Sequence, residues 1–182
     1  MRKIIVSTMV TLNAVMENPH LWSFDFMNDE IAKYAYDQLF AADTLLMGRV
    51  TYEGFAEAWS ARAGTDDFAD RINSLPKFVA SRTLKAPLRW NATLLEGDIE
   101  EEVARLKQQP GKNILQYGSG ELTHTLIQHG LVDEIRLLVY PVVVPNGAHI
   151  FENLSKTVLK LIDTRTFSSG VAALHYQPKR NE

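Results

Sequence analysis

Short apolar runs alternate along this sequence with segments in which apolar residues recur every three or four positions. Residues 4–6 and 44–47 are two such runs, typical of buried strands, and the segments between runs have the period of amphipathic helices. The last two runs, 157–167 and 171–177, are joined by residues 168–170, Ser-Ser-Gly, which predicts a hairpin. The pattern therefore predicts an α/β fold, with a mostly parallel central sheet flanked by helices and an antiparallel C-terminal hairpin.

The remaining elements are expected from the same signals. Further strands are predicted at 77–80, 90–95, 113–117 and 134–144, and helices at 29–40, 51–59, 67–74, 98–109 and 121–129. Three helix starts offer a side chain that can accept a hydrogen bond from a free helical N–H, namely Asn28, Thr51 and Asp98. Residues 11–27 form a long irregular segment, and segments of this length in compact domains are usually functional or mobile.

Composition narrows the classes of protein that this chain can belong to. The 182 residues contain no linker-like or repeated segment, so a single domain over residues 1–182 is expected. A net charge of −3 argues against a nucleic-acid binder, and no apolar stretch is long enough to cross a membrane. Without cysteine there is no disulfide or thiolate metal ligand, which favours a cytoplasmic location. The five histidines lack metal-ligand spacing, so no metal site is expected.

Three predicted strands end in turns that suit a phosphate-rich ligand. These turns are Gly48-Arg49-Val50-Thr51, Ser81-Arg82-Thr83 and Gly118-Ser119-Gly120. Guanidinium groups, hydroxyls and free N–H groups at a helix start all bind phosphate, and ligands of open α/β sheets bind at the carboxyl ends of the strands. A glycine-bearing turn is more often only a turn, and an arginine beside it is usually solvated. Three such turns at one edge nevertheless favour a nucleotide site, although neither the G-x-G-x-x-G fingerprint nor a P-loop is present.

Four segments resemble the dihydrofolate reductase superfamily, in the branch related to the reductase domain of bifunctional riboflavin-biosynthesis enzymes. They are Leu46-Met47-Gly48-Arg49-Val50-Thr51-Tyr52-Glu53, Lys77-Phe78-Val79-Ala80-Ser81-Arg82-Thr83-Leu84, Tyr117-Gly118-Ser119-Gly120-Glu121-Leu122, and Gly130-Leu131-Val132-Asp133-Glu134 followed by Tyr140-Pro141-Val142. The resemblance extends over residues 2–177. It implies a dihydrofolate-reductase-like fold, a homodimer and a stand-alone NADPH-dependent oxidoreductase that acts on a small molecule.

The resemblance also implies a cofactor site. Arg49 and Thr51 would meet the 2′-phosphate and the pyrophosphate, and Arg82 would flank the adenosine end. A guanidinium suits the 2′-phosphate, whereas an NADH site would want an acid for the ribose, and none lies between Gly48 and Thr51. The cofactor-binding set is Gly48, Arg49, Thr51, Ser81, Arg82, Thr83, Gly118, Ser119, Gly120, Glu121 and Leu122.

The substrate end departs from the family pattern. Thr11-Leu12-Asn13-Ala14 stands where many members have Ser-Leu-Asp-Gly, and Pro145-Asn146-Gly147 stands in place of a Gly-x-Gly. Asp29 is the first candidate for the proton donor, with Asp25, Glu30 or water as alternatives. An acid in a first helical turn commonly serves only the helix dipole. The expected substrate pocket consists of Asn13, Trp22 and Phe26, although aromatic residues are more often ordinary packing.

Several functions are compatible with these residues. The main alternative to a reductase is a protein that binds NADPH without turnover, because the Asn13-Ala14 departure touches the reactive end. Reduction of a ribosylamino-pyrimidine, as in riboflavin biosynthesis, and folate reduction are further alternatives. A dimer is also expected from the apolar run 137–144, which would be hazardous as an exposed edge strand, unless that strand is central.

Overall fold

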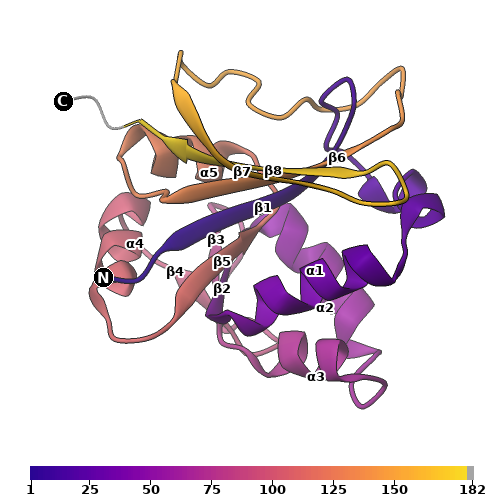
Figure 1. The fold of residues 1–182 in the computed structure, drawn as a ribbon. Coiled ribbons are helices and arrows are strands. Elements are labelled where there is room, and N and C mark those ends of the chain that lie inside the picture. The colour runs from indigo at the N-terminus through magenta and orange to yellow at the C-terminus, as the bar shows by residue number, and fades with distance from the viewer. Residues whose placement is uncertain (180–182) are drawn as a thin grey trace.

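The computed structural model describes residues 1–179, which form one eight-stranded sheet with helices on both faces (Figure 1). The strands are β1 (Ile4–Thr11), β2 (Ala42–Gly48), β3 (Lys77–Ala80), β4 (Ala92–Leu95), β5 (Asn113–Tyr117), β6 (Glu134–Tyr140), β7 (Leu159–Thr166) and β8 (Ala172–Pro178). Their order across the sheet is β4-β3-β2-β5-β1-β6-β8-β7. The first six strands in this order run parallel to one another. The hairpin of β8 and β7 is added antiparallel at one edge. The predicted fold class is confirmed.

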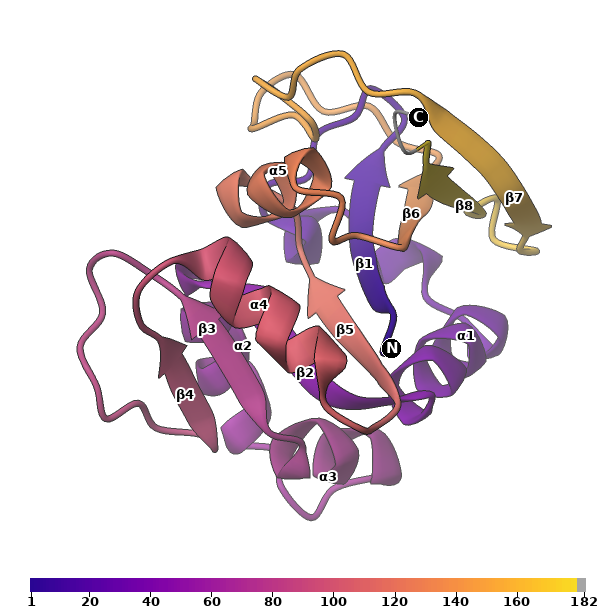
Figure 2. The same ribbon diagram turned by 90° about the vertical axis from the view of Figure 1, so that its left-hand side faces the viewer.

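Five α-helices cover the two faces of the sheet. They are α1 (Asp29–Phe40), α2 (Arg49–Ser60), α3 (Asp67–Ser74), α4 (Ile99–Gln108) and α5 (Glu121–Gln128), with two short 3₁₀ turns at Pro19–Leu21 and Phe24–Phe26. Figure 2 shows α4 and α5 on one face, whereas α1, α2 and α3 lie on the other. Each face buries its own apolar cluster, because neighbouring residues of a strand point to opposite sides. Ile4 and Val6 of β1 contact the first cluster, and Ile5 contacts the second.

Two of the three predicted caps are present. The Asn28 side chain accepts a hydrogen bond from the Ile31 N–H at 3.0 Å, and Asp98 caps α4 in the same way. The expectation for Thr51 is wrong, because α2 begins at Arg49 and Thr51 already lies inside its first turn. The N-cap of α2 is Gly48, whose extended backbone continues β2 directly into the helix.

The strand predicted at 134–144 is shorter than expected and lies in the interior of the sheet. β6 ends at Tyr140 because Pro141 has no N–H to donate to a neighbouring strand. It pairs with β1 on one side and with β8 on the other, so the argument for a dimer from an exposed apolar edge at this strand is wrong. The two edge strands are β4 and β7.

The helices of residues 1–179 are all too short or too polar to span a bilayer.

Candidate functional site

The three turns that carry the predicted phosphate-binding residues lie side by side at the carboxyl edge of the sheet. Strands β3, β2 and β5 are neighbours in that order, and they end at Ala80, Gly48 and Tyr117. All three strands are parallel, so the residues that follow them emerge at the same edge. The sheet thus brings together segments that are separated by more than thirty residues in the sequence.

Two contacts join these turns directly. Gly118 has a φ of +77°, and a Cβ at this position would lie 2.7 Å from the Thr51 hydroxyl, so the turn after β5 packs tightly against α2. The Arg82 guanidinium donates a hydrogen bond to the Glu121 carboxylate at 2.8 Å, which links the turn after β3 to the start of α5. Both side chains of this ion pair are largely exposed, so the pair lies on the surface of the site.

Arg49 is held by an acid that sequence reasoning did not assign to the site. Its Nη1 donates to Glu53 Oε2 at 2.8 Å, one helical turn along α2. The four-residue spacing of an arginine and a glutamate on a helix is a signal that could have identified this partner. About half of the Arg49 side chain remains exposed, at 45%, so the guanidinium keeps donors available for a ligand.

The start of α5 carries polar groups that lack a protein partner. Among the described residues, the buried Oγ of Ser119 and the buried Nε2 of His124 form no hydrogen bond. Burial lowers the pKa of His124, which favours its neutral form, while the nearby Glu121 opposes this shift. The helix start offers free N–H groups as well.

Ser81 and Thr83 order their own turn. The Ser81 hydroxyl accepts hydrogen bonds from the N–H groups of Thr83 and Leu84 at 3.1 and 3.0 Å. This turn presents Arg82 to the α5 side. Leu122 lies on the inner side of α5 and packs against the core beneath the helix.

The three residues of the expected substrate pocket lie where β1 and β6 end. Asn13 donates to the Val144 carbonyl at 2.8 Å and accepts from the Thr11 hydroxyl at 2.8 Å. The Trp22 ring is buried and packs edge-on against Tyr140, with ring centroids 5.3 Å apart, and Phe26 packs against the same tyrosine. These side chains fix the loop after β1 to the end of β6.

The acids around the start of α1 have different environments. Asp29 is exposed in the first turn of the helix, as Asp25 is in the preceding loop. Glu30 instead accepts hydrogen bonds from the Ser168 hydroxyl and N–H, which lower its pKa, and it thereby ties α1 to the β7–β8 hairpin. Glu30 is consequently less suited than Asp29 to donate a proton.

A charged cavity of about 330 Å³ lies away from this edge, between α1 and the hairpin side of the sheet. Arg136, His175 and Asp163 are cross-strand neighbours on β6, β8 and β7 and line it together with Tyr34. The cavity lies over the amino-terminal half of β6. The described residues contain no cluster of three or more side chains suited to a metal ion.

The comparisons with known proteins agree with this architecture. A family model described as the RibD C-terminal domain matches residues 2–173. YyaP of Bacillus subtilis (strain 168) is 33% identical over 190 residues, which cover 96% of this chain and 94% of that protein. YwjB of the same organism is 30% identical over 135 residues, covering 74% of this chain and 72% of that protein.

Two solved structures share the fold at low sequence identity. A Shewanella sp. PV-4 protein assigned to riboflavin biosynthesis has a TM-score of 0.76 at 21% identity, with 98% of this chain and 99% of that chain covered. A Thermotoga maritima diaminohydroxyphosphoribosylaminopyrimidine deaminase/5-amino-6-(5-phosphoribosylamino)uracil reductase has a TM-score of 0.69 at 13% identity, with 98% and 57% covered. With the family match over nearly its whole length, this chain belongs to the RibD C-terminal domain family.

Proposed function

We propose that this protein is an NADPH-dependent oxidoreductase that acts on a small molecule. Family membership supports an oxidoreductase, and a solved structure with this fold is named as a deaminase/5-amino-6-(5-phosphoribosylamino)uracil reductase. The observation that carries the proposal is the assembly of Arg49, Arg82 and the Gly118 turn at one edge of the sheet. This assembly combines two guanidinium groups with a helix start, which is what a phosphorylated dinucleotide requires.

Arg49 is the residue that would select NADPH over NADH. The 2′-phosphate brings about two negative charges and three acceptor oxygens, which a guanidinium fork meets better than a neutral side chain. Ser119 and His124 would hold the diphosphate through the atoms that lack a protein partner. Gly48 would lie beneath the cofactor, since a Cβ there would meet nothing within 4 Å, and Gly118 leaves the room that brings the Thr51 hydroxyl close to the turn after β5.

The cofactor supplies a hydride, and the protein must supply or position a proton. Asp29 is the proposed proton donor, because it is an exposed residue at the start of α1, and this helix start lies at the carboxyl edge of the sheet, where Asn28 contacts Ser168 of the hairpin turn. Asp25 and an ordered water are the alternatives.

Calorimetric titration of wild type and Arg49→Ala with NADPH and with NADH tests the proposal. A charge-assisted hydrogen bond contributes about 1.5–3 kcal/mol, so the variant should bind NADPH about 10- to 100-fold more weakly and NADH almost unchanged. Glu57→Gln, an exposed substitution further along α2, serves as the control. Equal binding of both nucleotides to the wild type, or equal loss of both in the variant, would contradict the role of Arg49.

Family membership favours a reductase over a protein that binds NADPH without turnover, the alternative raised by the departure at Asn13 and Ala14. Ala14 has a φ of +66°, so the chain keeps the left-handed turn that glycine favours although it has lost the glycine. Tight NADPH binding with no oxidation of the nucleotide across a panel of uncharged carbonyl and imine compounds would favour this alternative.

We also propose that the protein is a homodimer that uses the β7 edge. β7 is exposed along nearly its whole length and carries Leu161 and Ile162 on its surface. An exposed apolar edge strand tends to pair with another chain. Sedimentation equilibrium at micromolar concentration should give a mass of twice 20.5 kDa, whereas Leu161→Lys should give a monomer.

A further inference from the structure

Positive charge is unevenly distributed along the carboxyl edge of the sheet. On the side of β2 and β3 lie Arg49 and Arg82, which follow the carboxyl ends of these two strands. On the side of β1 and β6, the two segments 12–28 and 141–151 contain no lysine and no arginine. Because β5 separates β2 from β1 in the sheet, the Gly118 turn marks the boundary between a cationic half and a half without fixed positive charge.

The half without cations exposes large apolar side chains instead. Phe24 and Leu21, in the loop before α1, are 68% and 73% exposed. Leu12 follows β1 and Val143 follows β6, at 66% and 65% exposed. We call these four residues the apolar rim. Val50, exposed at the start of α2, lies on the other side of the Gly118 turn.

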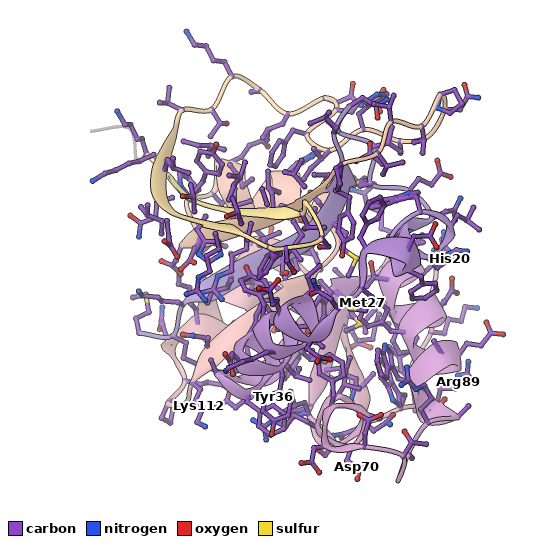
Figure 3. The ribbon with its side chains drawn as sticks, turned by 45° about the vertical axis from the view of Figure 1, so that its right-hand side comes forward. His20, Met27, Tyr36, Asp70, Arg89 and Lys112 are labelled. Carbon is purple, nitrogen blue, oxygen red and sulfur yellow. The ribbon has the colours of Figure 1, made fainter. Side chains whose placement is uncertain are left out.

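The apolar rim is held in place by buried contacts beneath it. The Leu12 N–H donates to the Val142 carbonyl at 2.9 Å, which joins the ends of β1 and β6. Trp22 donates through Nε1 to the Glu17 carbonyl at 3.0 Å and packs on Tyr140. Figure 3 labels His20 of this loop at the outer edge of the view. The exposed side chains therefore sit on a loop that is anchored to the core.

The charged groups on this side are unfavourable for a phosphate. Asp25 is exposed within the loop, and the Glu17 carboxylate accepts a hydrogen bond from the Ala148 N–H at 2.9 Å. Phosphate sites in proteins are built from arginine, lysine or clustered N–H groups. A phosphorylated substrate bound here would lie near two carboxylates and away from the arginines, which would serve the nucleotide.

We propose that the substrate is an uncharged, largely apolar molecule of aromatic type that carries no phosphate and packs against the apolar rim. The inference rests on the proposed function, since it takes the cationic half as the nucleotide site. Small-molecule sites gain most of their affinity from buried apolar area, and the rim would supply that area where β1 and β6 end. The substrate class of this protein therefore differs from a ribosylamino-pyrimidine phosphate.

Two probes with the same ring test the proposal, namely 1-naphthol and 1-naphthyl phosphate. Each is titrated calorimetrically into the full-length protein in the presence of saturating NADP⁺, so that the phosphate cannot occupy the nucleotide site. We expect 1-naphthol to bind at least about tenfold more tightly than 1-naphthyl phosphate. Phe24→Ser removes the phenyl ring that would be covered by bound 1-naphthol. The variant should therefore bind 1-naphthol about tenfold more weakly. Val158→Ser, at an exposed apolar residue that precedes β7 and lies away from the carboxyl edge, should leave binding unchanged.

The outcomes separate this inference from the proposed function. A direct NADP⁺ titration comes first, and failure of the nucleotide to bind contradicts the proposed function irrespective of the probes. If NADP⁺ binds but 1-naphthyl phosphate equals or exceeds 1-naphthol, the substrate class is wrong. The proposal is also overturned if Phe24→Ser changes the mass in sedimentation and leaves 1-naphthol binding intact, since the rim would then be an interface between copies.

Discussion

Arg82 donates a hydrogen bond to Glu121 across the opening between β3 and α5, at 2.8 Å. Glu121 is the first residue of α5, where the helix start favours negative charge. The carboxylate thus pairs with a guanidinium that, under the proposed function, would otherwise be available to a phosphate of the nucleotide. Binding of a nucleotide must separate this pair or displace it.

The first prediction concerns this acid. Glu121→Gln should strengthen NADPH binding about two- to fivefold, because it removes one negative charge near the phosphates and frees Arg82. The gain is small because both side chains are largely exposed. Fluorescence titration with NADPH measures it, and Glu152→Gln, exposed and distant in sequence, is the control. Weaker binding by Glu121→Gln would mean that the acid itself contacts the nucleotide.

The second prediction concerns the proton donor. Asp29→Asn should lower kcat by about 10²–10⁴-fold and leave the Kd for NADPH within about twofold, because the side chain lies at the start of α1 and not at the cationic turns. Asp25→Asn is the matched variant, since this acid is also exposed and lies four residues earlier. If Asp25→Asn shows the larger loss, the role passes to Asp25. If neither variant loses activity, water delivers the proton.

The third prediction concerns the backbone after β1. Ala14 has a φ of +66°, a region that costs a residue with a Cβ about 1 kcal/mol or more. Ala14→Gly should therefore raise the free energy of unfolding by about 0.5–1 kcal/mol, after the greater freedom of glycine in the unfolded chain is subtracted. Urea denaturation measures the change. A loss of stability would show that the Ala14 methyl group contributes packing that outweighs the backbone strain.

The fourth prediction concerns the pH dependence of stability. The Tyr34 hydroxyl lies 2.7 Å from Nε2 of the buried His175. Burial lowers the pKa of His175, and the charges of Arg136 and Arg165 lower it further, whereas Glu134 and Asp163 raise it. The folded-state pKa is thus below the unfolded value of about 6.5, so the unfolded chain binds more protons as the pH falls. The stabilising contribution is complete above about pH 6.5 and is lost as the pH falls toward the folded-state pKa.

His175→Gln should accordingly lose less unfolding free energy than the wild type between about pH 7 and about pH 5. His20→Gln, at an exposed position in the loop before α1, should follow the wild-type curve. Chemical denaturation at a series of pH values provides the comparison. Parallel curves for wild type and His175→Gln would show that the flanking Glu134 and Asp163 carboxylates accommodate the proton.

The order of strands and helices could be predicted because each element has a local signal. Asn28 and Asp98 illustrate this, since a side chain that caps its own helix needs no distant partner. The meeting of the three turns also followed from a general rule, because parallel strands end at one edge of their sheet. The end of β6 was missed because the apolar run continues to Val144, although Pro141 already carried the signal.

Other features depend on contacts that no local pattern records. The sequence shows only that Trp22 is an aromatic residue in a loop. Its burial depends on packing against Tyr140, which is far away in the sequence. The environment of His175 is formed by α1, β6 and β7, which are far apart in the sequence. The Arg82–Glu121 pair likewise spans 39 residues and depends on the order of β3 and β5 in the sheet.

The position of β1 has a consequence for synthesis on the ribosome. This strand is made before both of its neighbours in the sheet, which are β5, beginning at Asn113, and β6, ending at Tyr140. While the nascent chain grows, Ile4, Ile5 and Val6 have no strand to pair with, and they stay accessible until more than half of the protein has emerged. β1 therefore cannot reach its final pairing until both β5 and β6 have been made.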